Sequence, residues 1–336
     1  MRSKARFAAA LAAALALAAA GCGGDDNGDG GGEGEDSLRV AILLPGAVSD
    51  QGYNADGQRA AQQMEEELGA EVTLTESVAV PNQTDVYRQY ASQGYDLVIG
   101  WGGQFTDGAV TAAEEFPDVR FLVVNSNAEN GRNLASMDTA IEQWQFFAGW
   151  LAAKLSESGT VAWIGGQCFP ATAANLHGTE QGAKHADPDV EFLSRFTGDF
   201  EDPTKAQTAA KALIDQGADV ITGNLNNAWP GVYQAAREAG NLPVITEWVD
   251  NSDQAPEVIA SSVLKSQARF VVELARQAQE GTLEGKFYKF DLPEDWGDIV
   301  SDTELLPDDI HQEALEVQEQ LVNGEIEVEH DETCPS

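Results

Sequence analysis

The chain has 336 residues, with 19 lysines and arginines against 56 aspartates and glutamates, which gives a formal net charge of −37. A protein that binds nucleic acid or adheres to anionic lipid headgroups needs a basic face, so we expect neither kind of partner. The apolar fraction of 43% is ordinary for a globular protein, and the length predicts about two domains, each large enough to bury a core.

Residues 1–21 are predicted to form a lipoprotein export signal. Three basic residues precede an apolar run of about 14 residues, which is shorter than the roughly 20 that a membrane-spanning helix needs. The run ends in Ala-Ala-Gly-Cys, which resembles a lipobox, so Cys22 is the expected lipidation site and the new N-terminus. The alternative is an ordinary signal peptide that is cut nearby, with Cys22 incidental.

Residues 22–37 are predicted to be the lipidated cysteine and a flexible tether. The stretch GGDDNGDGGGEGEDS holds seven glycines and six acids and nothing to bury, which is typical of a self-repelling linker. Removal of residues 1–21 would take away three positive charges and no negative ones, so the net charge would become −40. We expect the protein on the extracytoplasmic face of the cell membrane, held there only by its lipid.

The body of the chain begins with alternating strands and helices. Short runs that are apolar or rich in Val and Thr predict strands at 38–44, 70–78, 96–99 and 119–124. Helical spacing predicts helices at 57–68, 85–92 and 107–115. Such a βαβαβαβ series builds a parallel sheet with helices on both faces.

The same alternation then repeats. Helices are predicted at 143–155, 171–185, 203–216 and 231–239, and strands at 160–164, 190–196, 218–222 and 243–245. After residue 255 the order changes, and the patterns predict a strand at 258–264, a helix at 265–279, a strand at 287–290 and a helix at 307–323.

We therefore predict an α/β protein of two doubly wound, Rossmann-like lobes joined by a hinge. The first lobe is assigned residues 38–138 plus 262–296, and the second lobe residues 139–261 plus 297–324. Residues 325–336 are rich in acids and are expected to be a tail outside the fold.

The three cysteines allow one disulfide. If Cys22 carries lipid, Cys168 and Cys334 remain outside the cytoplasm, where disulfides persist. Two alternatives stay open: a disulfide between Cys168 and Cys334, which would hold the tail near Cys168, or two free thiols. No Cys-x-x-Cys or Cys/His cluster is present, so a metal site is not expected.

Polar and aromatic residues follow the predicted strands. Doubly wound folds bind ligands at the carboxyl ends of their strands, where rings can stack on a flat heterocycle and carboxylates can accept from its hydroxyls. The alternative is that the rings pack at the lobe rims while Asn and Asp cap helices. The candidate ligand-binding residues in these loops are Asp50, Tyr53, Asn54, Phe105, Asp107, Phe169, Asn175, Phe200, Asn224, Trp248 and Asp250.

Several stretches taken together resemble the basic membrane protein family, the purine-nucleoside-binding lipoproteins of ABC transporters. They are SDQGYN, GGQFTDGAVTAAEEFPDVRFLVVN, EQWQFFAGWLAAKL, FEDPTKAQTAAKALIDQGADVIT and SSVLKSQARFVV. Each motif alone is weak, but together they cover nearly all of residues 38–324. The resemblance implies a type I periplasmic-binding fold and a permease partner.

The resemblance also implies roles for single residues. Tyr53 corresponds to the aromatic residue that stacks on the purine, and Asn54 lies beside it. Asp107, in the pattern Phe-x-Asp, corresponds to the carboxylate that binds the ribose hydroxyls. Lys265, in the pattern Ser-x-x-Lys, would reach the ligand or help to close the cleft.

Two departures from the family pattern affect the expected ligand site. Some members carry a second stacking ring at the position of Asn175, so Phe169, Phe200 or Trp248 would have to supply the other face. The loop at 223–229 is rich in Asn where relatives have small or acidic residues.

The sequence thus predicts an extracytoplasmic solute-binding lipoprotein, monomeric and without a cofactor, that closes on a purine nucleoside. A sensor of the same fold and a binding protein for another small polar ligand, such as a sugar, are the alternatives. A nucleoside hydrolase is disfavoured, since there is no Gly-x-Ser-x-Gly, Walker or His-Glu-x-x-His motif and the four histidines form no spaced cluster.

Overall fold

The structure is a computed structural model that describes residues 37–50 and 52–335. The predicted export signal, Cys22 and all of the tether except Ser37 lie outside the described residues.

The described strands form two sheets, and all of the pairings between named strands are parallel. The six-stranded sheet has the order β11-β5-β4-β3-β1-β2, and the five-stranded sheet the order β10-β9-β8-β6-β7. The first consists of β1 (Arg39–Leu43), β2 (Glu71–Thr75), β3 (Leu97–Trp101), β4 (Arg120–Val124), β5 (Leu134–Thr139) and β11 (Phe287–Phe290). The second consists of β6 (Thr160–Gly165), β7 (Glu191–Phe196), β8 (Val220–Asn224), β9 (Val244–Trp248) and β10 (Ile259–Leu264).

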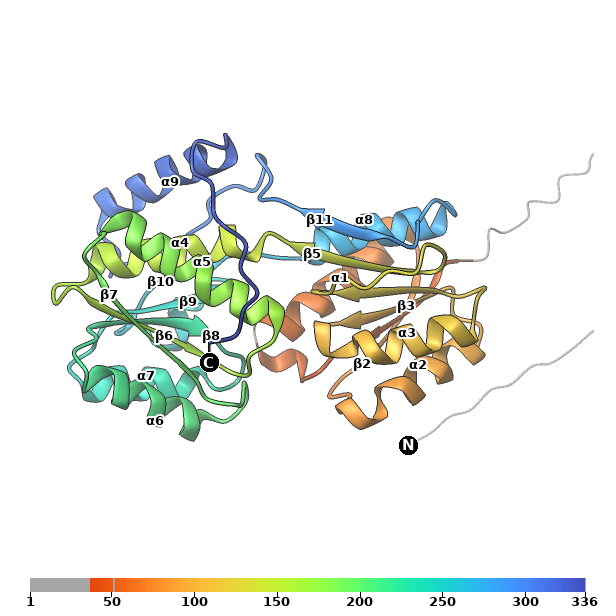
Figure 1. The fold of residues 1–336 in the computed structure, drawn as a ribbon, viewed down its shortest axis with the longest axis horizontal. Helices are drawn as coiled ribbons and strands as arrows, with labels where there is room; N and C mark the ends of the chain where they lie inside the picture. The colour runs from red at the N-terminus through yellow and green to blue at the C-terminus, as the bar shows by residue number, and fades with distance from the viewer. Residues whose placement is uncertain (1–36, 51, 336) are drawn as a thin grey trace, which may run out of the picture. The chain divides into compact units, whose positions relative to one another are not determined.

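Helices cover both faces of each sheet (Figure 1). We call the six-stranded sheet with its helices lobe 1; these are α1 (Tyr53–Leu68), α2 (Gln83–Ser92), α3 (Thr106–Glu115) and α8 (Ala268–Gln279). Lobe 2 is the five-stranded sheet with α4 (Ile141–Leu155), α5 (Pro170–Ala186), α6 (Pro203–Ile214), α7 (Trp229–Glu238) and α9 (Asp308–Val322). The predicted α/β class with two doubly wound lobes is confirmed.

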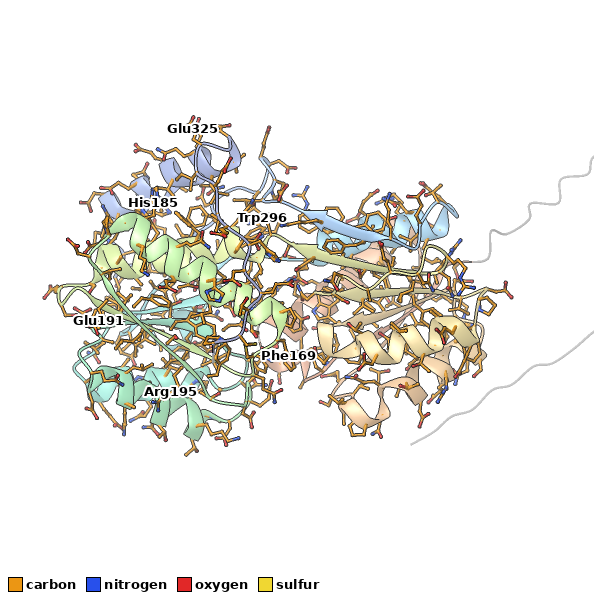
Figure 2. The ribbon with its side chains drawn as sticks, viewed as in Figure 1. Phe169, His185, Glu191, Arg195, Trp296 and Glu325 are labelled. Atoms are coloured by element: carbon orange, nitrogen blue, oxygen red, sulfur yellow. A yellow bond between two sulfur atoms is a disulfide. The ribbon has the colours of Figure 1, made fainter. Side chains whose placement is uncertain are left out.

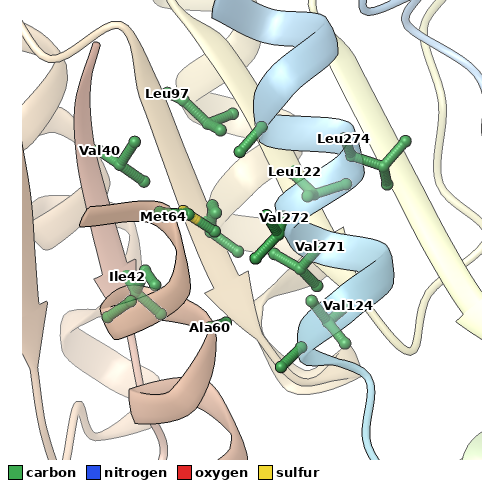
Figure 3. Close-up of a cluster of buried hydrophobic side chains, with 14 of the residues drawn as sticks. Val40, Ile42, Ala60, Met64, Leu97, Leu122, Val124, Val271, Val272 and Leu274 are labelled. Atoms are coloured by element: carbon green, nitrogen blue, oxygen red, sulfur yellow. The ribbon is translucent and has the colours of Figure 1, made fainter. Parts of the chain in front are cut away.

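The buried faces follow the apolar patterns of the sequence. In lobe 1, side chains of β1, β3 and β4 meet α1 and α8, with Met64 and Val271 among the buried contacts (Figure 3). The other face of that sheet packs against α2 and α3. Helices α4 and α5 cover one face of the second sheet, with α9 packed against α4, and α6 and α7 cover the other face.

The chain passes between the lobes three times: from β5 to α4, from β10 to α8, and from β11 to the segment at 299–300 that packs in lobe 2. The strand β10 belongs to the second sheet up to Leu264, three residues past the predicted boundary at 261. Strand β5 was not predicted, because LASMDT mixes polar with apolar residues although all six are buried between β4 and β11.

Helix α1 begins at Tyr53, four residues before the predicted start. The Asp50 carboxylate accepts hydrogen bonds from the backbone N–H groups of Gly52, Asn54 and Ala55, so it satisfies donors that the first helical turn leaves open. Tyr53 therefore lies in the first turn of a helix, not in a loop.

Helices α4 and α5 approach closely through glycines. A Cβ atom at Gly182 would lie 1.8 Å from the carbonyl oxygen of Phe146, and one at Gly149 would lie 1.7 Å from that of Thr179. This packing holds the second half of α5 against α4, while the start of α5 carries part of the candidate site described below.

We expect Gly182→Ala to lower the free energy of unfolding by about 2–3 kcal/mol, because the added methyl meets backbone that cannot rotate away. Gly57→Ala in α1 is the control, since its Cβ would meet side-chain atoms only, at 2.6 Å from Leu44 and 3.1 Å from the Trp101 ring, and we expect a smaller loss than for Gly182→Ala. Urea unfolding measures both. A Gly182→Ala protein as stable as the wild type would contradict the close approach.

Candidate functional site

A cavity of about 800 Å³ lies where the carboxyl ends of the central strands of both sheets meet. This volume is in the range of small-molecule sites. Its apolar wall includes Pro45, Tyr53, Val78, Val80, Ile141, Phe169, Pro170, Phe200, Trp248 and Phe287. Its polar wall includes Gln83, Gln104, Thr106, Asn125, Ser126, Asn127, Asp138, Gln167, Asp199, Glu201, Asn224, Asn226, Lys289, His330 and Glu332.

Tyr53 is held on the lobe 1 side of the cavity. Its hydroxyl donates to Asn125 Oδ1 at 2.8 Å, and Asn125 Nδ2 donates to Asp138 Oδ1 at 3.0 Å. Burial, with the negative charge of Asp138 next in weight, raises the pKa of Tyr53 well above its usual value. The Tyr53 hydroxyl therefore stays protonated and its ring is fixed in place.

Asp138 is the next-to-last residue of β5 and lines the cavity. Burial raises its pKa to about 7, although the hydrogen bond from Asn125 acts in the opposite direction, and the nearby Glu142 adds to the rise. Near neutral pH this carboxyl is close to half protonated, so it can either accept a hydrogen bond from a bound molecule or donate one.

Phe169 and Phe200 form an aromatic pair on the lobe 2 side. Their ring centroids are 6.4 Å apart and the ring planes differ by only 14°. Phe169 stands at the start of α5 (Figure 2), where its backbone N–H donates to Thr172 Oγ1. Phe200 lies over Gly166, where a Cβ would come within 2.2 Å of the ring, so the glycine makes room for Phe200.

Trp248 has a strained backbone beside the cavity. Its φ of 81° is in the left-handed region, which is rare for a bulky residue and costs of order 1–3 kcal/mol. The indole ring meets the Tyr53 ring edge-on at 5.3 Å, and Lys265 Nζ lies 4.2 Å from its centroid. A residue keeps a strained backbone conformation only where the contacts around it hold it there, and such residues are concentrated at functional sites.

A buried ion pair lies beneath Trp248. Lys265 Nζ donates to Glu247 Oε2 at 2.5 Å, and the side-chain amides of Gln145 and Asn224 donate to the same carboxylate at 2.7 and 2.6 Å. Burial lowers the pKa of Lys265, while the charge of Glu247 opposes this change. The cluster supports the cavity wall from behind, since only Asn224 of these four residues lines the cavity.

The structure brings some of the predicted site residues together around the cavity. These are Tyr53, Phe169, Phe200, Asn224 and Trp248. They come from α1 of lobe 1 and from the ends of four strands of lobe 2 or the loops that follow them, so only the fold places them near one another.

The structure places the other candidates elsewhere. Asp50 and Asn54 bond to each other at the start of α1, and Asp50 lines a smaller cavity of about 70 Å³. Phe105 is buried against Tyr87, and Asp107 is exposed in the first turn of α3. The remaining three are Asn175, which accepts from buried Trp163 Nε1; Asp250, which is exposed; and Lys265, which is paired with Glu247.

Several residues of the cavity wall were not predicted. Asn125 directly follows the predicted strand 119–124, so its position after a strand was the available signal. Asp138 is on the strand that the sequence did not reveal, and Lys289 is on β11. His330 and Glu332 belong to the tail that was expected to lie outside the fold.

Cys168 and Cys334 are joined by a disulfide in the structure. No group of His, Cys, Asp and Glu side chains within residues 37–50 and 52–335 is arranged to hold a metal ion. In the same part of the chain, no helix has the length and apolar content needed to cross a bilayer.

Comparison with known proteins places this architecture among solute-binding proteins. Residues 37–332 match the model of a family described as ABC transporter substrate-binding protein PnrA-like. Basic membrane protein B of Borrelia garinii subsp. bavariensis is 30% identical over 241 residues, 68% of this chain and 70% of that protein. A purine-binding protein of Brucella abortus is 25% identical over 295 residues, 87% of this chain and 83% of that protein.

A solved structure supports the fold. The crystal structure of an ABC transporter solute-binding protein from Aeropyrum pernix K1 superposes with a TM-score of 0.77 at 20% identity, over 88% of this chain and 94% of that one.

Proposed function

Because the chain belongs to the family of PnrA-like ABC transporter substrate-binding proteins, we propose that it captures a purine nucleoside in the cavity between its lobes and delivers it to a permease. The observation that carries the proposal is the pair of aromatic walls, with Tyr53 and Trp248 at one side of the cavity and Phe169 and Phe200 at the other. The printed name of the Brucella abortus relative, a purine-binding protein, supports the same ligand class.

The polar wall suits a ligand with several donors and no phosphate. Asp138, Asp199, Glu201 and Glu332 line the cavity, against Lys289 and His330. Lys289 Nζ is already 3.3 Å from Glu142 Oε1, so it is partly neutralised. A phosphate group would meet an excess of carboxylates, whereas ribose hydroxyls and ring amines can donate to them.

Capture would work by closure of the lobes around the ligand. The open cavity admits the nucleoside, the rings bury its base, and the polar wall satisfies its hydroxyls. Ligand contacts to both lobes would shift the population toward a closed form, which a permease recognises. No covalent bond changes in this cycle. The lipid anchor at Cys22 would keep the protein at the extracytoplasmic face of the membrane.

Differential scanning fluorimetry with purine nucleosides, nucleoside monophosphates, sugars and amino acids tests the proposal. Inosine, guanosine or adenosine is expected to raise the melting temperature, while the matching monophosphates leave it unchanged. A shift with a sugar and none with any purine nucleoside would contradict the ligand assignment.

We expect Phe200→Ala to weaken inosine binding by about tenfold to a hundredfold, because stacking of an aromatic ring on a base contributes about 1–3 kcal/mol. Phe200→Tyr keeps the ring face and is expected to bind within about threefold of the wild type. Isothermal titration calorimetry measures both affinities. Equal affinity of Phe200→Ala and the wild type would remove Phe200 from the site.

A further inference from the structure

The C-terminal tail follows a defined path across lobe 2. In Figure 1 the dark blue segment leaves α9 and crosses α5 before the C-terminus. Ile326 and Val328 pack against the lobe 2 core. Gln181 of α5 exchanges two hydrogen bonds with the backbone of Glu329, each 2.8 Å long. The tail is therefore seated on the protein by packing and by paired hydrogen bonds.

Two contacts fix the far end of the tail. His177 Nε2 lies 2.9 Å from the carbonyl oxygen of Thr333, and Cys334 is joined to Cys168. Cys168 immediately precedes Phe169, one of the aromatic residues that line the cavity. The disulfide thus ties the tail to the same loop that presents an aromatic wall.

The seated tail turns two side chains toward the cavity. His330 Nδ1 lies 3.1 Å from Glu142 Oε2, and His330 Nε2 lies 3.3 Å from Glu332 Oε1. Burial alone would lower the pKa of His330, but the adjacent Glu142 carboxylate outweighs it and the pKa is raised. The Glu332 side chain keeps 37% of its surface exposed, so part of its carboxylate remains open to a ligand.

We propose that the tail segment 329–334 forms a wall of the ligand cavity through His330 and Glu332, and that Glu332 is a specificity-determining residue that accepts hydrogen bonds from ligand hydroxyl or amino groups. The disulfide between Cys168 and Cys334 holds this wall in place. The carboxylate that the family resemblance assigned to the ribose, Asp107, is exposed and does not line the cavity. Glu332 and Asp138 line the cavity, so their carboxylates can meet a ligand that Asp107 does not reach.

The wall itself can be tested without a ligand. Hydrogen exchange of the wild-type protein is expected to show slow exchange in the tail, above all at the backbone amide of Glu329, which donates to Gln181 of α5. In Cys168→Ser/Cys334→Ser, or in the wild type after reduction, the tail amides are expected to exchange much faster. Equally fast exchange in the oxidised wild type would overturn the proposal.

The role of Glu332 is tested by affinity, and this part rests on the proposed function for the choice of probe. Inosine is expected to bind Glu332→Gln about tenfold more weakly than the wild type, as for a lost hydrogen bond to a charged group. Glu327→Gln is the matched control, since it removes one charge from the same tail outside the cavity wall, and we expect a change below about twofold. Cys168→Ser/Cys334→Ser is expected to lose at least as much affinity as Glu332→Gln.

The outcomes separate the two proposals. If the wild type binds no purine nucleoside but the tail amides are protected, the proposed ligand is wrong and the wall stands. Glu332→Gln and Glu327→Gln are then compared with the solute that shifts the melting temperature. Equal affinity of Glu332→Gln and the wild type, with either probe, would remove Glu332 from the site.

Discussion

Replacement of Lys265 by methionine is expected to lower the free energy of unfolding by about 3–5 kcal/mol. The substitution would leave the buried Glu247 carboxylate without its cation, and removal of one partner from a buried ion pair is strongly destabilising. Gln145 and Asn224 would still donate to Glu247, so its hydrogen bonds would be partly kept. Urea unfolding at pH 7 measures the loss.

The double variant Glu247→Gln/Lys265→Met separates charge from packing. Since no unpaired charge remains in it, we expect it to recover a large part of the stability, with a coupling free energy of about 2 kcal/mol or more. The exposed pair Lys211 and Glu238 is the control, and Lys211→Met is expected to cost less than about 1 kcal/mol. Similar losses for Lys265→Met and Lys211→Met would contradict the buried pair.

Substitution Asp138→Asn is expected to stabilise the protein at pH 8 by up to about 4 kcal/mol. Burial raises the pKa of Asp138 to about 7, against an ordinary value near 4, and each unit corresponds to about 1.4 kcal/mol. Between about pH 4 and pH 7 the folded protein binds a proton that the unfolded chain has released. Stability of the wild type therefore falls as the pH rises through this window.

The test compares how the free energy of unfolding depends on pH in the wild type and in Asp138→Asn. The advantage of Asp138→Asn is expected to be full above about pH 7 and to shrink as the pH falls toward 4, where the wild-type carboxyl is protonated in both states. The charges of Glu142, His330 and Glu332 act on Asp138, so the difference between the two profiles reports the whole cluster. Denaturation at pH 5, 6, 7 and 8 measures it, and parallel profiles would contradict a raised pKa.

The same substitution is expected to reduce ligand affinity, because asparagine cannot offer two acceptor oxygens to the ligand. A gain in stability with a loss of binding would mean that the burial of Asp138 is retained for function. A gain in stability with unchanged inosine affinity would instead assign Asp138 a role in fixing Asn125 and Tyr53.

Most of the fold could be predicted from apolar patterns. The buried strands β1 and β3 read as continuous apolar runs, and α8 places Phe270, Val271 and Leu274 on one face. Strand β5 could not be predicted in this way, because its burial comes from β4 and β11 on either side and not from its own composition. The prediction that the tail lies outside the fold was wrong for a related reason. The tail is rich in acidic residues, and its two apolar residues that pack against the lobe 2 core, Ile326 and Val328, lie between them.

The candidate site was predictable only where a residue lies between a predicted strand and the next predicted helix. Tyr53, Phe169, Phe200 and Asn224 fit that rule and line the cavity. Asp50 follows β1 as well, but its carboxylate is used to cap α1. The sequence shows that a polar residue lies near a strand end. It does not show whether that side chain forms hydrogen bonds to nearby backbone groups instead of to a ligand.

Calorimetric titration of the purified protein with inosine, inosine monophosphate and ribose tests whether this cavity binds a purine nucleoside. One molecule of inosine is expected to bind per chain, with affinity reduced in Phe200→Ala, and no comparable binding of the monophosphate or of ribose is expected. Binding of ribose at one site per chain, without heat from inosine or any other purine nucleoside, would contradict this expectation.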